Sequence, residues 1–489
     1  MSVGQGFRHG VAWLFVGNTG KQVLGFLFGI VLARLLAPED FGALLTIQVF
    51  TGLAGFVAGG GMGQALVRAK TVAQADYDIV FTLQLGIGCL IYAGFFAAAP
   101  WFAEWYDTPL YADLLRVSAL SFIFRPLVNL PASMLYRQQR YRAQTLVGIG
   151  SLFVTSITSI VLAWQGYGVW SLIWAGIAGS AYNVAVLIPL ARWRPGFSLE
   201  FRRGRDIARY GLLVSANDIV NYLRAQVSVF LLSQGAGAAS VGLYNKGESL
   251  ARMPHGFITG SVYQVLFRAM AAEQDDLDMC RYLYFRSVAL VAVYATPFYV
   301  GLLWLAEPLI RGVYGEQWTA AAGPLAILAF AWPFWLFNQL SGAVLAARGW
   351  LGRELKIQLA VLAATALAVW LALPHGIDGV AWAIVGAAVF ASLAMQRLAL
   401  QCLDGRWRAS LRALVPAALL NVPLAVTLYL LERTLPSAWL AHDLAHVAIV
   451  GAAGGLVYAG GLLLLPIPEL ATERLRWKSK LGLSRPTKP

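Results

Sequence analysis

The stretch IVFTLQLGIGCLIYAGFFAAAPWFA, residues 79–103, contains no charged side chain over 25 residues. An apolar helix of about 20 residues is long enough to cross the roughly 30 Å hydrocarbon core of a bilayer. Similar stretches recur along the whole chain, which has 489 residues and is 59% hydrophobic but only 12% charged. Soluble chains carry about a quarter charged residues. The sequence therefore predicts an all-α polytopic membrane protein.

The apolar runs predict about 14 transmembrane helices, near residues 10–33, 41–66, 79–103, 113–135, 146–165, 168–190, 211–233, 240–267, 283–310, 320–346, 355–373, 378–400, 411–432 and 443–465. With this division, 28 Lys and Arg residues lie on the side of the two termini and three lie on the opposite side. Such an excess marks the cytoplasmic side, so both termini are predicted to be cytoplasmic. The net charge of +13 is accordingly interpreted as loop charge, and no nucleic-acid partner is expected.

The two halves of the chain resemble each other at an offset near 200 residues. Residues 41–44, FGAL, match residues 241–244, VGLY, and residues 64–68, QALVR, match residues 264–268, QVLFR. Six helices per copy imply a parallel repeat, in which the substrate site lies between the halves. The predicted parts are an N-terminal six-helix lobe (1–195), a second six-helix lobe (196–405), and two added helices with a basic cytoplasmic tail (406–489).

Ionisable side chains inside the predicted helices are the candidate substrate-binding residues. They follow single helix faces and are predicted to line a cavity, because charges at the bilayer centre are costly elsewhere. With Arg116, the predicted helices contain six buried cations but only two clear anions, Asp218 and Glu248, so an anionic ligand or water is needed to balance the surplus positive charge. The planar guanidinium of arginine can donate two parallel hydrogen bonds to one phosphate or carboxylate group. The predicted cavity residues are Lys21, Arg125, Asn221, Arg224, Lys246, Glu248 and Arg252.

Other interpretations of these residues stay open. Lys246 lies near a helix end, where its ammonium group can reach the interface. Glu248 and Arg252 are four residues apart and can neutralise each other. Asp218 is interpreted first as a partner of Arg224 or Asn221 and second as an ion-coupling group.

The chain contains no motif that is typical of catalysis. It has no phosphate-binding loop and no HExxH sequence, and its His442 and His446 lack a third metal ligand. We therefore expect no enzyme, metal or cofactor. Transport must then run on an H⁺ or Na⁺ gradient, on the substrate's own gradient or on a coupled pathway.

Residues 31–42, VLARLLAPEDFG, resemble the first-loop signature of the polysaccharide transporter family, the flippases of lipid-linked oligosaccharides within the multidrug/oligosaccharidyl-lipid/polysaccharide exporter superfamily. Residues 61–68 and the basic turn at 137–142 are similar to further family segments, and the resemblance covers about residues 5–410. It implies two six-helix lobes around a cationic cavity, lined by the first, second, seventh and eighth helices. The positions of Lys21, Asn221, Arg224 and Arg252 fall on these helices.

The resemblance also implies a substrate and a location. The substrate would be an oligosaccharide repeat on undecaprenyl diphosphate, moved by alternating access to the periplasmic leaflet of the bacterial inner membrane. A polysaccharide polymerase and export machinery would be further partners. Family members often carry an acid late in the seventh helix, where this chain has Gln226, Val227 and Ser228, so no specific coupling acid can be carried over.

Three rival functions remain at this stage. A multidrug exporter of the same superfamily should have an acidic cavity, because its substrates are largely cations. A peptidoglycan-precursor flippase would have similar chemistry to the proposed transporter. A membrane glycan polymerase or ligase should have a large outer loop, whereas the predicted outer loops are short.

Overall fold

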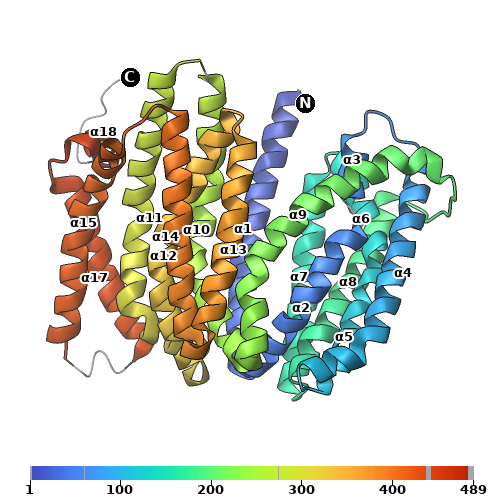
Figure 1. Cartoon of the computed structure of the whole chain (residues 1–489). Coiled ribbons are helices and arrows are strands. Elements are labelled where there is room, and N and C mark those ends of the chain that lie inside the picture. Colours follow the sequence, from blue (N-terminus) through green and yellow to red (C-terminus); the bar gives the residue numbers. More distant parts are fainter. Residues whose placement is uncertain (1–2, 60, 274, 437–441, 483–489) are drawn as a thin grey trace. The chain divides into compact units, whose positions relative to one another are not determined.

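The computed structural model describes residues 3–59, 61–273, 275–436 and 442–482, and these residues are mostly helical and contain no strand (Figure 1). They belong to two compact units, Met1–Gly242 and Leu243–Pro489. The predicted all-α fold is confirmed, while the three-part division at residues 195 and 405 stays a prediction.

The first unit consists of nine helices and the start of a tenth among its described residues. Helix α1 packs on α7, α2 and α3 pack on α9, and α6 packs on α8. The helices are α1 (Val3–Leu35), α2 (Pro38–Gly59), α3 (Met62–Arg68), α4 (Gln74–Trp105), α5 (Leu110–Ala119), α6 (Ser121–Arg137), α7 (Tyr141–Trp164), α8 (Val169–Ala191), α9 (Phe201–Gly235) and the start of α10 (Gly237–Ala272).

In the second unit, α11 packs against α12, α15 and α17, and α12 also packs against α14. Its elements after α10 are α11 (Leu277–Tyr314), η1 (Glu316–Ala321), α12 (Ala322–Ala347), α13 (Leu351–Ala372), η2 (Leu373–His375), α14 (Gly376–Cys402), α15 (Trp407–Thr434), α17 (Asp443–Leu464), η3 (Pro468–Leu470) and α18 (Ala471–Lys480).

Ten segments of the described chain are long and apolar enough to cross a membrane. One of them, Leu351–Cys402, contains both α13 and α14, which correspond to two predicted spans. The predicted spans on α1, α9 and α10 are not among the ten; these helices have 33, 35 and 36 residues and carry most of the predicted cavity residues. The protein therefore has many spans, and the count of fourteen stays a prediction.

The predicted helix at 41–66 is divided in the structure. Helix α2 ends at Gly59 and α3 begins at Met62, with Gly61 in the left-handed region at a φ of 53°. Glycine adopts this conformation without the steric cost that a Cβ adds. The glycines at positions 59–61 were the sequence signal for this break.

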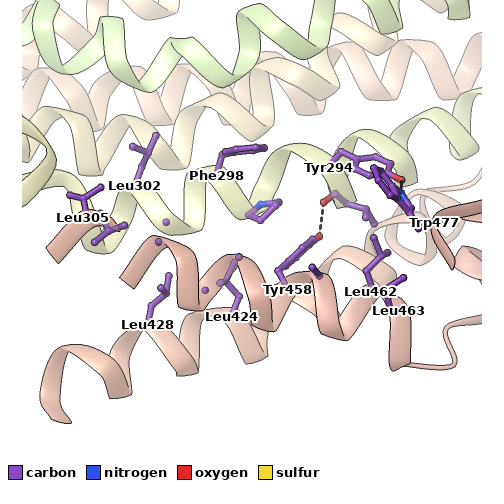
Figure 2. A pocket seen from close by; sticks show the side chains of 18 of the residues that line it. Tyr294, Phe298, Leu302, Leu305, Leu424, Leu428, Tyr458, Leu462, Leu463 and Trp477 are labelled. Atoms are coloured by element: carbon purple, nitrogen blue, oxygen red, sulfur yellow. Dashed lines mark hydrogen bonds between the residues drawn. The ribbon is translucent and has the colours of Figure 1, made fainter. Parts of the chain in front are cut away.

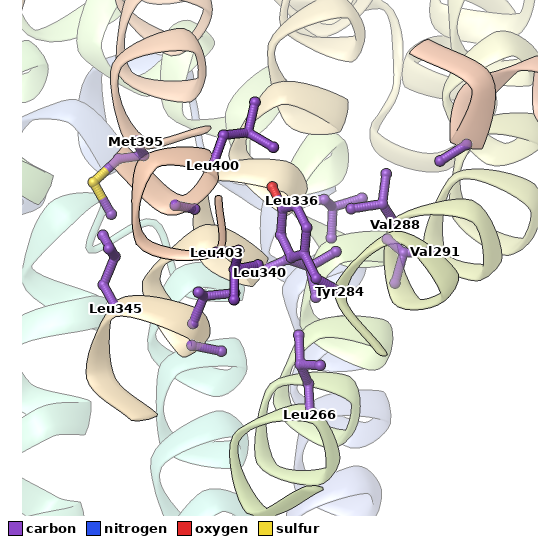
Figure 3. Close-up of a cluster of buried hydrophobic side chains, with 14 of the residues drawn as sticks. Leu266, Tyr284, Val288, Val291, Leu336, Leu340, Leu345, Met395, Leu400 and Leu403 are labelled. Atoms are coloured by element: carbon purple, nitrogen blue, oxygen red, sulfur yellow. The ribbon is translucent and has the colours of Figure 1, made fainter. Parts of the chain in front are cut away.

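Each unit has its own apolar core. In the first unit, Leu66, Val80, Leu130 and Leu135 are fully buried in one cluster. In the second unit, buried side chains of α10, α11, α12 and α14 surround Tyr284 (Figure 3). The Tyr284 hydroxyl lies 3.0 Å from the Ser341 Oγ, so this polar group is paired inside the core.

Two glycines that the repeat matches with each other make a reciprocal contact. A Cβ on Gly42 of α2 would collide with the backbone oxygen of Ala238, and a Cβ on Gly242 of α10 would collide with the backbone oxygen of Pro38. The same offset of 200 residues relates Pro38 to Ala238 and Gly42 to Gly242. The first turns of α2 and α10 therefore touch through their backbones.

Arg137, in the predicted basic turn, closes the end of α3. Its guanidinium donates to the carbonyl oxygens of Leu66 at 2.9 Å and Lys70 at 2.8 Å, and also to that of Ala69. The last carbonyls of a helix have no partner within the helix. Arg137 supplies these partners from the end of α6.

Candidate functional site

Lys21 lies on α1 with its side chain half-buried toward α7. Its Nζ would be 3.1 Å from a Cβ on Gly148, so the absence of a side chain on Gly148 leaves room for the ammonium group. Within the described parts of the chain, Lys21 forms no ion pair. Lys21 is thus a cation without a described carboxylate partner, on a helix that the sequence predicts to be transmembrane.

Arg125 of α6 extends its guanidinium to α2. Its Nη1 donates a 2.8 Å hydrogen bond to the carbonyl oxygen of Gly55, and its Cζ lies 5.7 Å from the centre of the Phe122 ring. A Cβ on Gly55 would be only 2.6 Å from Nη2, so glycine is needed for this approach. Arg125 forms no ion pair with any described carboxylate. The backbone carbonyl and the aromatic ring stabilise the charge of Arg125 only partly.

Helix α9, which carries the candidate residues Asp218, Asn221 and Arg224, is hydrogen-bonded to α2. The Tyr222 hydroxyl donates to the carbonyl oxygen of Gln48 at 2.6 Å, and the Ser215 hydroxyl donates to that of Phe56 at 2.9 Å. Near these contacts, Asp218 and Arg224 are half-buried and Asn221 is exposed.

Helix α2 is the common neighbour of these groups in the first unit. A Cβ on Gly52 would meet the Tyr222 hydroxyl of α9, and one on Gly55 would meet Arg125 of α6. The two glycines are three residues apart and therefore share one face of α2. The structure thus brings Arg125 and the candidate-bearing part of α9 to the same face.

In the second unit, Lys246 of α10 is 9% exposed and lies between aromatic rings. Its Nζ is 5.0 Å from the centre of the Tyr314 ring and 5.2 Å from that of Trp318. Aromatic faces attract an ammonium group through their quadrupole. The structure thus gives this lysine a packed environment, and its substrate-binding role stays a prediction.

Glu248 is half-buried and Arg252 is exposed on the same helix. The two side chains form no ion pair, although they are four residues apart. Arg252 nevertheless acts electrostatically on Glu248, so the interpretation that the two charges offset each other stays open. The cavity that the repeat predicts between the halves stays a prediction.

The sequence did not predict an apolar cavity in the second unit, between α11, α15, α17 and α18 (Figure 2). Its volume is about 680 Å³, within the range of about 300–1,000 Å³ that ligand pockets occupy. Leucine is the most frequent lining residue, and Gly301, Gly451 and Gly455 leave space where larger side chains would stand. The small residues at positions 451–455, GAAGG, are a sequence feature that agrees with this space.

Pro297 accounts for a hydrogen bond between two helices in one wall of this cavity. Because Pro297 has no N–H, the carbonyl oxygen of Val293, four residues earlier, has no donor within α11. The Tyr458 hydroxyl of α17 donates to this oxygen at 2.5 Å, as one dashed line in Figure 2 marks. This hydrogen bond joins α17 to α11 beside the cavity.

Helix α18 closes one end of the cavity. Its Trp477 lines the cavity and donates from Nε1 to the Tyr294 hydroxyl at 2.9 Å, and this hydroxyl donates to Glu473 at 3.0 Å. Glu473 is 9% exposed and lies 3.6 Å from the guanidinium of Arg286. These contacts attach the basic C-terminal helix to α11.

The helices and their apolar surfaces define an integral membrane protein with many spans, as its described residues show. The family described as polysaccharide biosynthesis protein matches residues 31–323, which is more than half of the chain, and the chain belongs to this family. This confirms the polysaccharide transporter family that the first-loop signature predicted.

Two relatives and one solved structure illustrate the similarity. The chain is 26% identical over 321 residues to the succinoglycan biosynthesis transport protein ExoT of Rhizobium meliloti (strain 1021), covering 66% of this chain and 65% of the relative. It is 23% identical over 334 residues to the lipopolysaccharide biosynthesis protein WzxC of Escherichia coli (strain K12), covering 67% of each. The chain thus spans about two thirds of the length of these curated relatives.

The fold resembles that of the lipid II flippase MurJ in an inward closed conformation. The TM-score is 0.70 at 16% sequence identity, over 92% of this chain and 99% of MurJ. At this level of identity the similarity concerns the fold alone.

Proposed function

We infer that this protein is a transporter of lipid-linked oligosaccharide and not an enzyme. It belongs to a polysaccharide biosynthesis family, and its Rhizobium meliloti relative is named as a succinoglycan transport protein. The proposed substrate is an oligosaccharide repeat on undecaprenyl diphosphate. The protein moves it from the cytoplasmic to the periplasmic leaflet of a bacterial inner membrane, and both of its termini are cytoplasmic.

The observation that carries the proposal is a pair of half-buried cations without described carboxylate partners, Lys21 and Arg125. A cation at membrane depth is costly unless water or an anion compensates it. A diphosphate supplies two phosphoryl groups that accept charge-assisted hydrogen bonds. An ammonium group and a guanidinium with remaining donors are suited to bind it.

In the proposed mechanism, these cations recognise the diphosphate of the substrate, and movement of the two halves carries the substrate across the membrane. Lys21, Arg125 and Arg224 bind the diphosphate, while Asn221 contacts the sugar through its exposed amide. Lys246, Glu248 and Arg252 of the second half complete the cavity. The halves then alternate between openings to the two sides, and an H⁺ or Na⁺ gradient supplies the energy, with Asp218 as the candidate coupling residue.

The test is complementation of a strain that lacks the gene, with Lys21→Gln compared with Lys21→Arg. We expect Lys21→Gln to reduce surface polysaccharide about tenfold or more, because a hydrogen bond to a charged group is worth about 1.5–3 kcal/mol. Lipid-linked intermediates should accumulate in the cytoplasmic leaflet. Lys21→Arg keeps the charge and should retain most of the export.

Arg125 needs a different comparison, because it also joins α6 to α2. Arg125→Lys keeps the charge but loses the fork, and Arg125→Gln loses both. Membrane abundance and elution as a single folded species must match the wild type for each variant. Normal export by Lys21→Gln and Arg125→Gln, at wild-type abundance, would exclude the proposed cation site.

The same assay separates the proposed function from its nearest rival. If the protein were a peptidoglycan-precursor flippase, deletion of its gene should cause lysis and should leave surface polysaccharide unchanged. The proposed transporter should instead leave growth intact while surface polysaccharide is lost.

A further inference from the structure

The polar groups at the edge of the apolar cavity are already paired within the protein. The Tyr458 hydroxyl donates to Val293, and the Tyr294 hydroxyl is engaged by Glu473 and Trp477. The rest of the lining is almost entirely aliphatic and aromatic side chains and glycines. An occupant can therefore place only hydrocarbon in this cavity without leaving a polar group unpaired.

Apolar walls alone do not select an occupant inside a membrane. Lipid chains are as apolar as leucine side chains, so a chain gains little by leaving the bilayer for the cavity. Preference for one lipid must therefore come from its polar end. The charges at the mouth of the cavity decide which head group is favoured.

Helix α18 supplies those charges. Within ten residues it carries four cations, Arg474, Arg476, Lys478 and Lys480. Its single acid, Glu473, is buried and forms ion pairs with Arg286 and Arg476, so it does not offset the two lysines. The Nζ of Lys480 lies 5.2 Å from the centre of the Trp477 ring, and the same ring lines the cavity. A positive charge thus stands next to the end of the apolar space.

We propose that the cavity between α11, α15, α17 and α18 binds an anionic phospholipid, with an acyl chain in the cavity and its phosphate on Lys480 and the neighbouring cations of α18. Basic segments that directly follow a transmembrane helix attract anionic lipids. Tryptophan is common at the level of the head groups, which agrees with the position of Trp477. None of the predicted cavity residues lines this site, and the proposal does not depend on the identity of the transported substrate.

The experiment is native mass spectrometry of the full-length protein with added phosphatidylglycerol or phosphatidylethanolamine. We expect the wild type to retain phosphatidylglycerol in preference. Lys480→Glu reverses one charge at the cavity mouth and should reduce this preference about fivefold or more. Arg268→Glu makes the same charge change on an exposed residue that does not line the cavity, and it should leave the preference unchanged.

A second variant tests the cavity itself. A Cβ on Gly455 meets no atom within 4 Å, so Gly455→Leu extends into the space without an initial collision. It should lower retention of both lipids, while Lys480→Glu should lower that of phosphatidylglycerol alone. Both variants must elute as folded protein.

Three results would overturn the proposal. The first is equal retention of the two lipids by the wild type. The second is unchanged retention in both Lys480→Glu and Gly455→Leu. The third is a polyprenyl-linked glycan, rather than a phospholipid, as the lipid that copurifies and is lost in Gly455→Leu.

Discussion

At the scale of single residues, the sequence explains why Arg137 is charged but does not predict its hydrogen bonds. The sequence placed Arg137 in a basic cytoplasmic turn, and the structure adds hydrogen bonds to carbonyl oxygens of Leu66, Ala69 and Lys70. Arg125 is similar, because its described partner is the carbonyl of Gly55. Every residue has a backbone carbonyl, so such partners leave no mark in a sequence.

Replacing Arg137 by lysine tests whether the several hydrogen bonds of its guanidinium stabilise the protein. A lysine keeps the charge but cannot reach several carbonyls at once. We expect Arg137→Lys to lower the free energy of unfolding by about 2 kcal/mol, since hydrogen bonds to charged groups contribute about 1.5–3 kcal/mol. Thermal unfolding in detergent would measure this as a lower Tm. Arg268→Lys, on an exposed residue, is the control, and equal Tm values for the two variants would contradict the prediction.

At the scale of helices, the sequence predicted where helices lie more successfully than where they break and what they contact. Long apolar runs identify helices because each must satisfy its own backbone in lipid. The break at Gly61 and the cavity beside Pro297 depend on local backbone geometry and on which helix packs nearby. The Pro297 ring removes one donor, but only the fold determines that Tyr458 replaces it.

A double-mutant cycle tests this replacement. Tyr458→Phe should lower the free energy of unfolding by about 1–3 kcal/mol, because it leaves the Val293 carbonyl without a donor. Pro297→Ala restores a backbone N–H that can serve the same carbonyl. In the Pro297→Ala background, Tyr458→Phe should therefore cost clearly less. Equal costs in the two backgrounds, measured by thermal or denaturant unfolding, would disprove the link between these residues.

At the scale of the whole molecule, composition and one signature were enough for the fold class and the family. The apolar runs predicted a polytopic all-α protein, and residues 31–42 predicted the family that matches residues 31–323. The candidate site was less accessible to sequence reasoning. Lys21 and Arg125 are half-buried without described ion pairs, and their role stays a prediction, while Lys246 lies beside aromatic rings that come about 70 residues later in the chain.

The orientation of the molecule is a prediction at this scale. The excess of Lys and Arg on one side predicts that both termini are cytoplasmic. Alkaline phosphatase needs disulfides, which form in the periplasm and not in the cytosol. Fused after Ala37, between α1 and α2, it should be active, and fused after Arg142 it should be inactive. A fluorescent protein at the C-terminus should fold and emit, and the reverse pattern would refute the assigned orientation.

The reciprocal contact of Gly42 and Gly242 restricts which residues the two matched segments can carry at these positions. At either position a heavier side chain meets the same obstacle, a main-chain oxygen of the other copy, which no rotamer change can remove. Glycine is therefore required at both positions, 200 residues apart, for the first turns of α2 and α10 to remain in contact.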